Sequence, residues 1–133
     1  MDIALLNGHI PVDTQALIDM GEIREDFHYK SEWKFEGRLK DELVGLIAYT
    51  KGKFEDGTIV PQFVHVLIAK KYRGKDEARK LLKLTETHLK RSGYSQVFAY
   101  IKNDRKYMQR SAVHHGYKSW SSDEDGKFFY KNI

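Results

Sequence analysis

The sequence predicts one mixed α/β (α+β) domain over residues 1–133, with a mostly antiparallel sheet flanked by helices. Three observations predict it. The chain has 133 residues, a length that suits a single hydrophobic core. Hydrophobic residues make up 41% of it and aromatic residues 13%, which is enough to pack such a core. Runs rich in β-forming residues come first with turn signals between them, and helical patterns alternate with strands later.

The first half of the chain predicts short helices followed by a three-stranded meander. Apolar residues recur at helical spacing between residues 16 and 27. Alternation from Trp33 and an apolar run from Leu43 predict two strands joined by a tight turn. The Asp56-Gly57 pair is a strong hairpin signal, so the third strand is expected at Ile59 to Ala69.

The second half predicts a helix, a strand, a second helix and a hairpin. Gly74 precedes a helical apolar stripe that ends before Gly93. An aromatic and aliphatic strand follows at residues 96–101. Asn103 is expected to cap a helix that reaches about His115, because its side chain can accept from the free N–H groups of a first turn. The acidic tip at residues 123–125 reads as a solvated turn of the final hairpin.

Composition excludes several classes of protein. The chain contains no cysteine, which excludes a disulfide scaffold, a thiolate zinc site and a cysteine nucleophile. No apolar run approaches the roughly 18 to 20 residues that span a bilayer, and the start MDIALLNGHIPVD does not resemble a signal peptide. His114 and His115 are adjacent and point to different helix faces, so no metal site is expected. We therefore expect a cytoplasmic protein without a membrane or metal partner.

Positive charge gathers in one segment. Residues 70–91 hold nine basic and three acidic residues, a net charge of +6, whereas the whole chain carries +4. Such a field attracts phosphates of a cofactor or of a nucleic acid, although a solvated helix face explains it equally well. The segment is also where a strand runs through a short loop into a helix. The free N–H groups of a first helical turn suit a pyrophosphate.

Two stretches of the sequence resemble the GNAT superfamily of N-acetyltransferases. The first is VHVLIAKKYRGKDEARKLL, from Val64 to Leu82, which is similar to the family's cofactor loop, (Arg or Gln)xxGxGx or with Ala at the last small position. The residues on that pattern are Arg73, Gly74, Lys75, Asp76, Glu77 and Ala78. The second, NDRKYMQRSAVHHGY, is similar to the family's strand-to-helix segment ending in Gly-(Phe or Tyr). A looser likeness to small bacteriophage GNAT-like proteins would place the chain in a host cytoplasm.

The resemblance implies acetyl-CoA as acyl donor and an amine as acceptor. It places the thioester carbonyl near the backbone of Val66 and Ile68, and Asn103 matches a position that contacts the pantetheine arm in relatives. His65 is the best candidate for the base that deprotonates the amine, because an unperturbed imidazole has a pKa near 6.5. A histidine on an apolar strand is otherwise a core residue. Gln62 and Glu32 are weaker options for the base. The family's general-acid tyrosine falls on Ala112, so Tyr107 on the same helix is a possible substitute unless it serves packing, and Ser111 or His114 are others.

Two departures from the family pattern keep other functions open. Asp76 stands at a small loop position, where a carboxylate repels a pyrophosphate, although it can also cap the helix. Together with Ala112, it favours a GNAT fold that has lost catalysis and binds a protein, for example a phage product that engages a host protein. A third reading is a nucleic-acid binder that uses the basic segment, with Tyr72 and Tyr94 as stacking surfaces. The sequence leaves the acceptor and a homodimer undecided.

Overall fold

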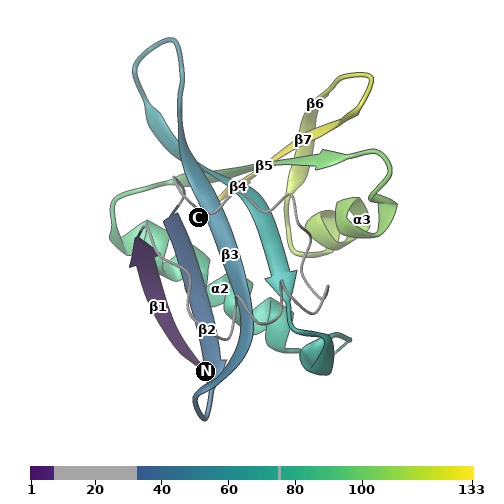
Figure 1. Cartoon of the computed structure of the whole chain (residues 1–133). Coiled ribbons are helices and arrows are strands. Elements are labelled where there is room, and N and C mark those ends of the chain that lie inside the picture. The colour runs from purple at the N-terminus through teal and green to yellow at the C-terminus, as the bar shows by residue number, and fades with distance from the viewer. Residues whose placement is uncertain (8–32, 75) are drawn as a thin grey trace. The chain divides into compact units, whose positions relative to one another are not determined.

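The computed structural model describes residues 1–7, 33–74 and 76–133 (Figure 1). The helices predicted between residues 16 and 27 lie outside these residues. Within the described part, neither α-helix has the length and apolar character needed to cross a bilayer. The elements in chain order are β1 (Asp2–Asn7), β2 (Trp33–Leu39), β3 (Glu42–Lys53), β4 (Ile59–Ile68), a short 3-10 helix (Lys70–Tyr72), α2 (Glu77–Arg91), β5 (Gln96–Lys102), α3 (Lys106–His114), β6 (Lys118–Ser122) and β7 (Gly126–Asn132).

The strands form a seven-stranded sheet in the hydrogen-bonded order β1-β2-β3-β4-β5-β7-β6. β1 with β2, β2 with β3, β5 with β7 and β6 with β7 are antiparallel. β4 and β5 are parallel, with Gln62 opposite Phe98 and Phe63 opposite Ala99. The predicted mixed, mostly antiparallel sheet with helices is therefore confirmed. The three strands of the predicted meander correspond to β2, β3 and β4, whereas the edge strand β1, of six residues, was not predicted.

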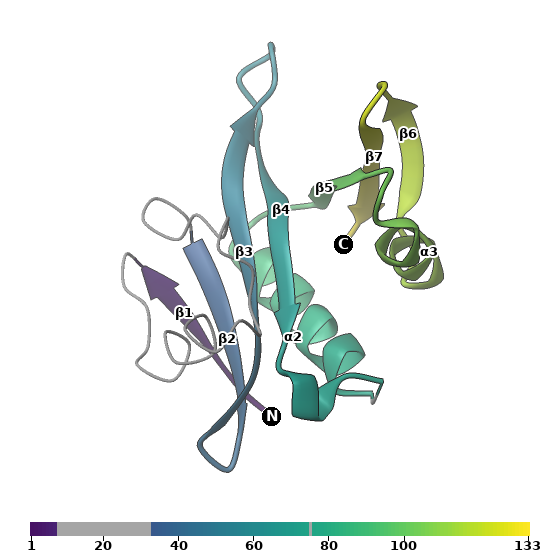
Figure 2. The same ribbon diagram turned by 45° about the vertical axis from the view of Figure 1, so that its right-hand side comes forward.

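The chain forms two compact units, and β3, β4 and α2 each contribute to both. The first unit comprises Met1–Thr50 and His65–Thr85. Its core holds Val44 and Ile47 of β3 and Leu81 of α2, all at most 1% exposed. A Cβ atom added to Gly37 of β2 would lie 2.8 Å from Leu81 Cδ1, so α2 packs closely on this strand. Figure 2 shows α2 along one face of the strands.

The second unit comprises Lys51–Val64 and Glu86–Ile133. It contains the hairpin between β3 and β4, where Gly57 has a φ of +88° and Asp56 Oδ1 accepts a hydrogen bond from the Thr58 N–H at 2.9 Å. The Asp56-Gly57 hairpin prediction is confirmed. Val97 of β5 and Phe129 of β7 are buried in its core. α3 lies beside β5 and β6 (Figure 1).

The predicted cap of α3 was wrong. Arg105 occupies the N-cap position of α3, and no side chain there bonds to the helix. Asn103 lies two residues earlier, where it is too far upstream to meet the first turn as a cap. Its amide nitrogen instead donates to the Glu124 carbonyl, and its amide oxygen accepts from Gln109.

Candidate functional site

The first part of the candidate site is the connection from β4 to α2. Gly74 has a φ of +74°, a left-handed conformation that favours glycine. An added Cβ atom would meet nothing within 4 Å, so Gly74 is required by the backbone angle and not by crowding. Gly74 and Asp76 are exposed, and Lys75 lies outside the described residues. The backbone therefore turns at Gly74, and Gly74 and Asp76 are accessible to solvent before the first turn of α2.

Arg73 bends back over the end of β4. Its Nε donates a hydrogen bond to the Ile68 carbonyl at 3.0 Å, and the residue remains exposed. Val66 and Ile68 are half-buried. Two residues predicted to bind the cofactor, Arg73 and Ile68, thus contact each other directly, and the guanidinium lies at the mouth of the loop.

Asp76 is the residue immediately before α2. Its carbonyl accepts the Lys80 N–H at 3.1 Å, which is the first hydrogen bond of the helix. Its carboxylate accepts from Arg79 Nη2 at 3.0 Å, and this hydrogen bond lowers the pKa of Asp76 below its ordinary value. Arg79 therefore offsets the negative charge that sequence reasoning placed against a pyrophosphate.

Glu77 turns away from solvent, with 18% of its side chain exposed. Its Oε1 lies 3.6 Å from Lys80 Nζ. Its Oε2 is buried and has no hydrogen-bond partner in the described part of the chain. Glu77 and half-buried Ala78 thus line the inner side of the first turn, whereas Asp76 faces outward.

Glu42, at the start of β3, completes a polar cluster that sequence reasoning missed. Its carboxylate accepts from Lys71 Nζ at 2.9 Å and from the Tyr72 hydroxyl at 2.8 Å. These hydrogen bonds lower the pKa of Glu42 and raise the pKa values of Lys71 and Tyr72. Glu42 is 29 residues from Lys71, so no local spacing could reveal the contact.

Glu42, which lies outside the basic segment, adds one carboxylate to its local charge. In the part of the segment that the structure describes, three ion pairs with carboxylates are present. The pairs are Lys71 with Glu42, Arg79 with Asp76 and Lys80 with Glu77. The Tyr72 hydroxyl is also engaged, which restricts the ring as a stacking surface.

The second part of the candidate site is the connection from β5 to α3, in the second unit. Asn103 is half-buried and both ends of its amide are hydrogen-bonded, to the Glu124 carbonyl at 3.3 Å and to Gln109 Nε2 at 3.1 Å. Gln109 is buried and also donates to the Ile101 carbonyl at 3.0 Å. This network, which the sequence did not reveal, fixes the position of Asn103.

Of the two candidate proton-transfer residues, Tyr107 has a described side chain and His65 does not. Tyr107 is 71% exposed near the start of α3, and half-buried Ala112 on the same helix offers no hydroxyl. His65 lies in β4, and its side chain is outside the described part. The loop residues belong to the first unit, and Asn103 and Tyr107 belong to the second. In residues 1–7, 33–74 and 76–133, no three His, Asp or Glu side chains gather as metal ligands.

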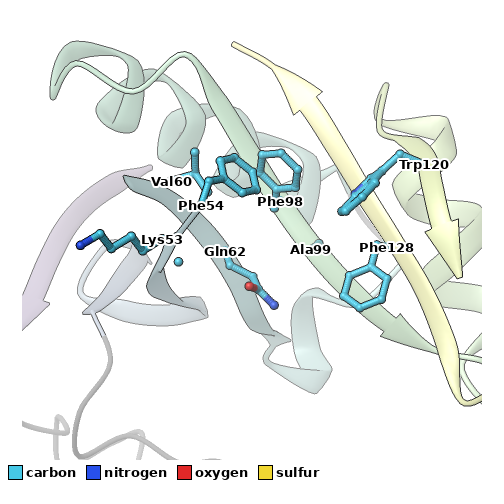
Figure 3. Close-up of a pocket in the computed structure, with 9 residues that line it drawn as sticks. Lys53, Phe54, Val60, Gln62, Phe98, Ala99, Trp120 and Phe128 are labelled. Carbon is cyan, nitrogen blue, oxygen red and sulfur yellow. The ribbon is translucent and has the colours of Figure 1, made fainter. Parts of the chain in front are cut away.

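A pocket of about 200 Å³ lies wholly within the second unit (Figure 3). Aromatic side chains from β5, β6, β7 and the hairpin after β3 line it, together with Gln62 and Lys53. Sequence reasoning missed this pocket because its residues are spread from position 52 to position 128. The aromatic residues near both hairpins were the available signal, but their meeting depends on strand order.

Comparisons with known proteins relate the chain to solved structures. No protein-family model and no curated protein sequence matches it. An IAA acetyltransferase from Bacillus cereus superposes with a TM-score of 0.74 at 12% identity, covering 99% of both chains. A GNAT family acetyltransferase from Elizabethkingia anophelis, solved with acetyl-CoA bound, gives 0.73 at 12% identity over 99% of this chain and 97% of that one. A GNAT family acetyltransferase from Streptococcus pneumoniae gives 0.68 at 12% identity over 99% and 100%. The chain has the GNAT fold.

The GNAT fold accommodates both stretches that carry the sequence resemblance. Arg73, Gly74 and Asp76 lie between β4 and α2, Glu77 and Ala78 begin α2, and residues 103–117 run from the end of β5 through α3. The resemblance to the superfamily is thus confirmed at the level of the fold. The shared fold does not assign a reaction to these residues, because one fold hosts many functions.

Proposed function

We propose that this protein transfers an acetyl group from acetyl-CoA to an amine of a small molecule or a protein. The observation that carries the proposal is the turn at Gly74, which leads β4 into the first turn of α2. The first N–H groups of a helix have no partner within the helix, and the helix dipole is positive there. Both features suit the pyrophosphate of a CoA molecule.

The side chains around the turn fit such an anion. Lys70 and Arg73 are exposed at the loop, and Arg79 compensates the carboxylate of Asp76. An arginine beside a phosphate forms charge-assisted hydrogen bonds, which are stronger than those between neutral groups. We assign the pyrophosphate to the segment from Arg73 to Ala78, the thioester carbonyl to the backbone of Val66 and Ile68, and the pantetheine arm to Asn103.

Bound acetyl-CoA would supply the activated thioester, and the chain's own residues would move protons. The acceptor amine must be neutral to attack, so a base has to take its proton. We assign this task to His65, whose ordinary pKa lies near neutrality. We assign protonation of the leaving thiolate to Tyr107, whose exposed phenol on α3 is accessible for that purpose.

A GNAT-fold binding protein without turnover is the second candidate. The observation that favours it is Ala112, which puts no hydroxyl at the family's general-acid position. Under this alternative, the protein would be a bacteriophage product that binds a host protein. A nucleic-acid module ranks third, since three basic residues of the segment are paired with carboxylates. Its affinity would fall steeply with salt.

Titration of acetyl-CoA by calorimetry tests the cofactor site. Arg73→Ala should weaken binding about tenfold or more, because a hydrogen bond to a charged group contributes roughly 1.5–3 kcal/mol. Arg91→Ala is the matched control: it removes the same group from the other end of α2, roughly 20 Å away. Equal losses in both variants, or no heat with millimolar cofactor, would contradict the site.

Acyl transfer itself is tested by screening amines for acetyl-CoA-dependent release of free thiol. With an acceptor in hand, Tyr107→Phe should lower kcat about 100-fold or more, the usual contribution of a general acid. The affinity for acetyl-CoA should not change, because the side chain is exposed and outside the loop. Tyr94→Phe, another partly exposed tyrosine, should retain kcat. Full activity of Tyr107→Phe would remove Tyr107 from the mechanism, and cofactor binding without any turnover would favour the second candidate.

A further inference from the structure

The pocket of the second unit is walled by four aromatic rings. Phe98 of β5 makes edge-to-face contacts with Phe54, at 5.3 Å between ring centroids, and with Trp120, at 6.1 Å. Trp120 contacts Phe128 of β7 at 5.7 Å. Figure 3 shows Phe54 and Phe98 on one side of the pocket and Trp120 and Phe128 on the other. Rings held edge to face present both the faces and the edges that a further ring prefers to contact.

The size of the pocket limits its ligand. Its volume is about 200 Å³, and the small Ala99 forms part of its wall. An apolar cavity of roughly 150 Å³ is large enough for benzene. The pocket therefore suits one ring or two fused rings.

Two large apolar residues of this wall are exposed to solvent. Phe54 is 39% exposed and Trp120 is 54% exposed. A single exposed aromatic residue is ordinary, but two that converge on one concavity mark a ligand site. A planar group that enters the pocket would remove apolar surface of both from water.

The polar groups of the pocket restrict the charge of the ligand. Gln62 projects from β4 into the pocket (Figure 3), and its amide has no hydrogen-bond partner in the described part of the chain. It can therefore donate to or accept from a ligand atom. Among the described residues, Lys53 is the only charged residue that lines the pocket, and its ammonium group points away from the aromatic rings (Figure 3), so its charge acts from the rim. A cationic ligand would find no carboxylate among the described residues of the lining.

We propose that this pocket binds a planar group of one or two aromatic rings that is neutral or anionic and carries a hydrogen-bonding atom. The aromatic rings supply the contact surface, Gln62 supplies the hydrogen bond and Lys53 sets the charge preference. The proposal concerns residues of the second unit alone. It does not depend on the proposed acyl transfer.

Three naphthalene probes that differ in charge test the preference by calorimetry. We expect 2-naphthol and 2-naphthoate to bind saturably with one site per chain. Protonated 2-naphthylmethylamine should bind at least threefold more weakly than 2-naphthoate. Lys53→Ala should remove this difference. Tighter binding of the cation, or no saturable binding of any probe to folded protein, would overturn the proposal.

Variants of the lining test the location. Trp120→Ala should weaken binding of 2-naphthoate about three- to tenfold, the range measured for aromatic pairs. Gln62→Leu removes the amide but keeps a side chain of similar size. It should weaken the binding of 2-naphthol and of 2-naphthoate by a similar factor. Leu5→Ala is the matched control, because Leu5 is 51% exposed but lies in β1 of the first unit. An equal loss in Leu5→Ala would place the probes elsewhere. Binding of acetyl-CoA is measured in a separate titration, so the pocket proposal and the proposed acetyl transfer can fail independently.

Discussion

The two compact units use the same ion-pair chemistry at different depths. In the first unit, Lys71 and Glu42 pair at the surface, with side chains 65% and 50% exposed. In the second, Lys131 and Glu86 pair at 2.8 Å with side chains 26% and 8% exposed. Water screens the first pair, whereas the second carboxylate has left water and depends on its partner. The surface pair reduces the positive charge beside the basic loop, and the buried pair compensates a carboxylate that water no longer solvates.

The buried pair also involves Tyr117. Lys131 Nζ lies 5.6 Å from the centroid of the Tyr117 ring, within range of a cation–π contact. The Tyr117 hydroxyl is buried without a hydrogen-bond partner among the described residues. Burial, and secondarily the charge of Glu86, raises the pKa of Tyr117. The Lys131 ammonium group thus contacts both the Glu86 carboxylate and the Tyr117 ring. Removal of Lys131 or of Glu86 would leave the other charged group without this counter-charge.

The largest effect is expected from Glu86→Ala. It leaves the partly buried Lys131 without its counter-charge, and breaking a buried pair in this way costs about 3 kcal/mol of unfolding free energy. Urea denaturation measures the loss. Glu42→Ala, which breaks the surface pair, should leave the urea midpoint within experimental error. If the two variants lose similar stability, the contrast between the units is wrong.

A smaller loss is expected from Gly126→Ala at the start of β7. The added Cβ atom would lie 2.7 Å from the Ile101 carbonyl oxygen and 2.6 Å from Tyr100 Cζ, so backbone must shift. Overpacking of this kind costs about 2 kcal/mol. Gly37→Ala in β2 meets only the ends of the Leu81 and Met1 side chains, so it should cost less. Denaturation that ranks Gly37→Ala as the more harmful change would contradict this assignment.

The smallest effect concerns Tyr100 and Asp123, which share a hydrogen bond of 2.9 Å. Burial and this bond raise the pKa of Tyr100 to about 12, and the same bond lowers the pKa of Asp123. A raised tyrosine pKa stabilises the fold below the unfolded pKa of about 10, and this contribution is lost between pH 10 and 12. A lowered aspartate pKa stabilises the fold above about pH 4, and this contribution is lost as the pH falls further.

Tyr100→Phe separates this pair from other titrating groups. We expect the wild type to lose more stability than Tyr100→Phe from pH 10 to 12, and again from pH 4 downward. Urea midpoints measured across both ranges provide the comparison. Parallel pH profiles for the two proteins would show that the hydrogen bond contributes nothing to the pH dependence.

Local patterns predicted most of the described elements. Alternation from Trp33, the Asp56-Gly57 turn and the helical stripe before Gly93 correspond to β2, the hairpin of β3 and β4, and α2. β1 was missed because a short edge strand is defined by its pairing with β2. The Asn103 cap was wrong because the amide found tertiary partners in Gln109 and in the hairpin before β7.

The residues of the candidate site also divide into those that a local pattern indicates and those that only a tertiary contact brings together. The loop from Arg73 to Ala78 was predicted because its residues are consecutive and their pattern is local. The compensation of Asp76 by Arg79 is also local, since three residues on a helix bring side chains together. Glu42 was invisible, because only the return of β4 beside β3 brings Lys71 and Tyr72 to it.

By itself the sequence determined the order of the strands and helices from β2 to β7, the turns, the basic loop and the absence of cysteine chemistry. The tertiary structure alone decided that Glu86 meets Lys131, 45 residues away, and that four aromatic residues between positions 54 and 128 enclose one pocket. The physical reason is the separation along the chain of the residues that interact. Periodicity and turn chemistry depend on neighbours along the chain, whereas ion pairs and pockets depend on strand order and register, which only the folded sheet fixes.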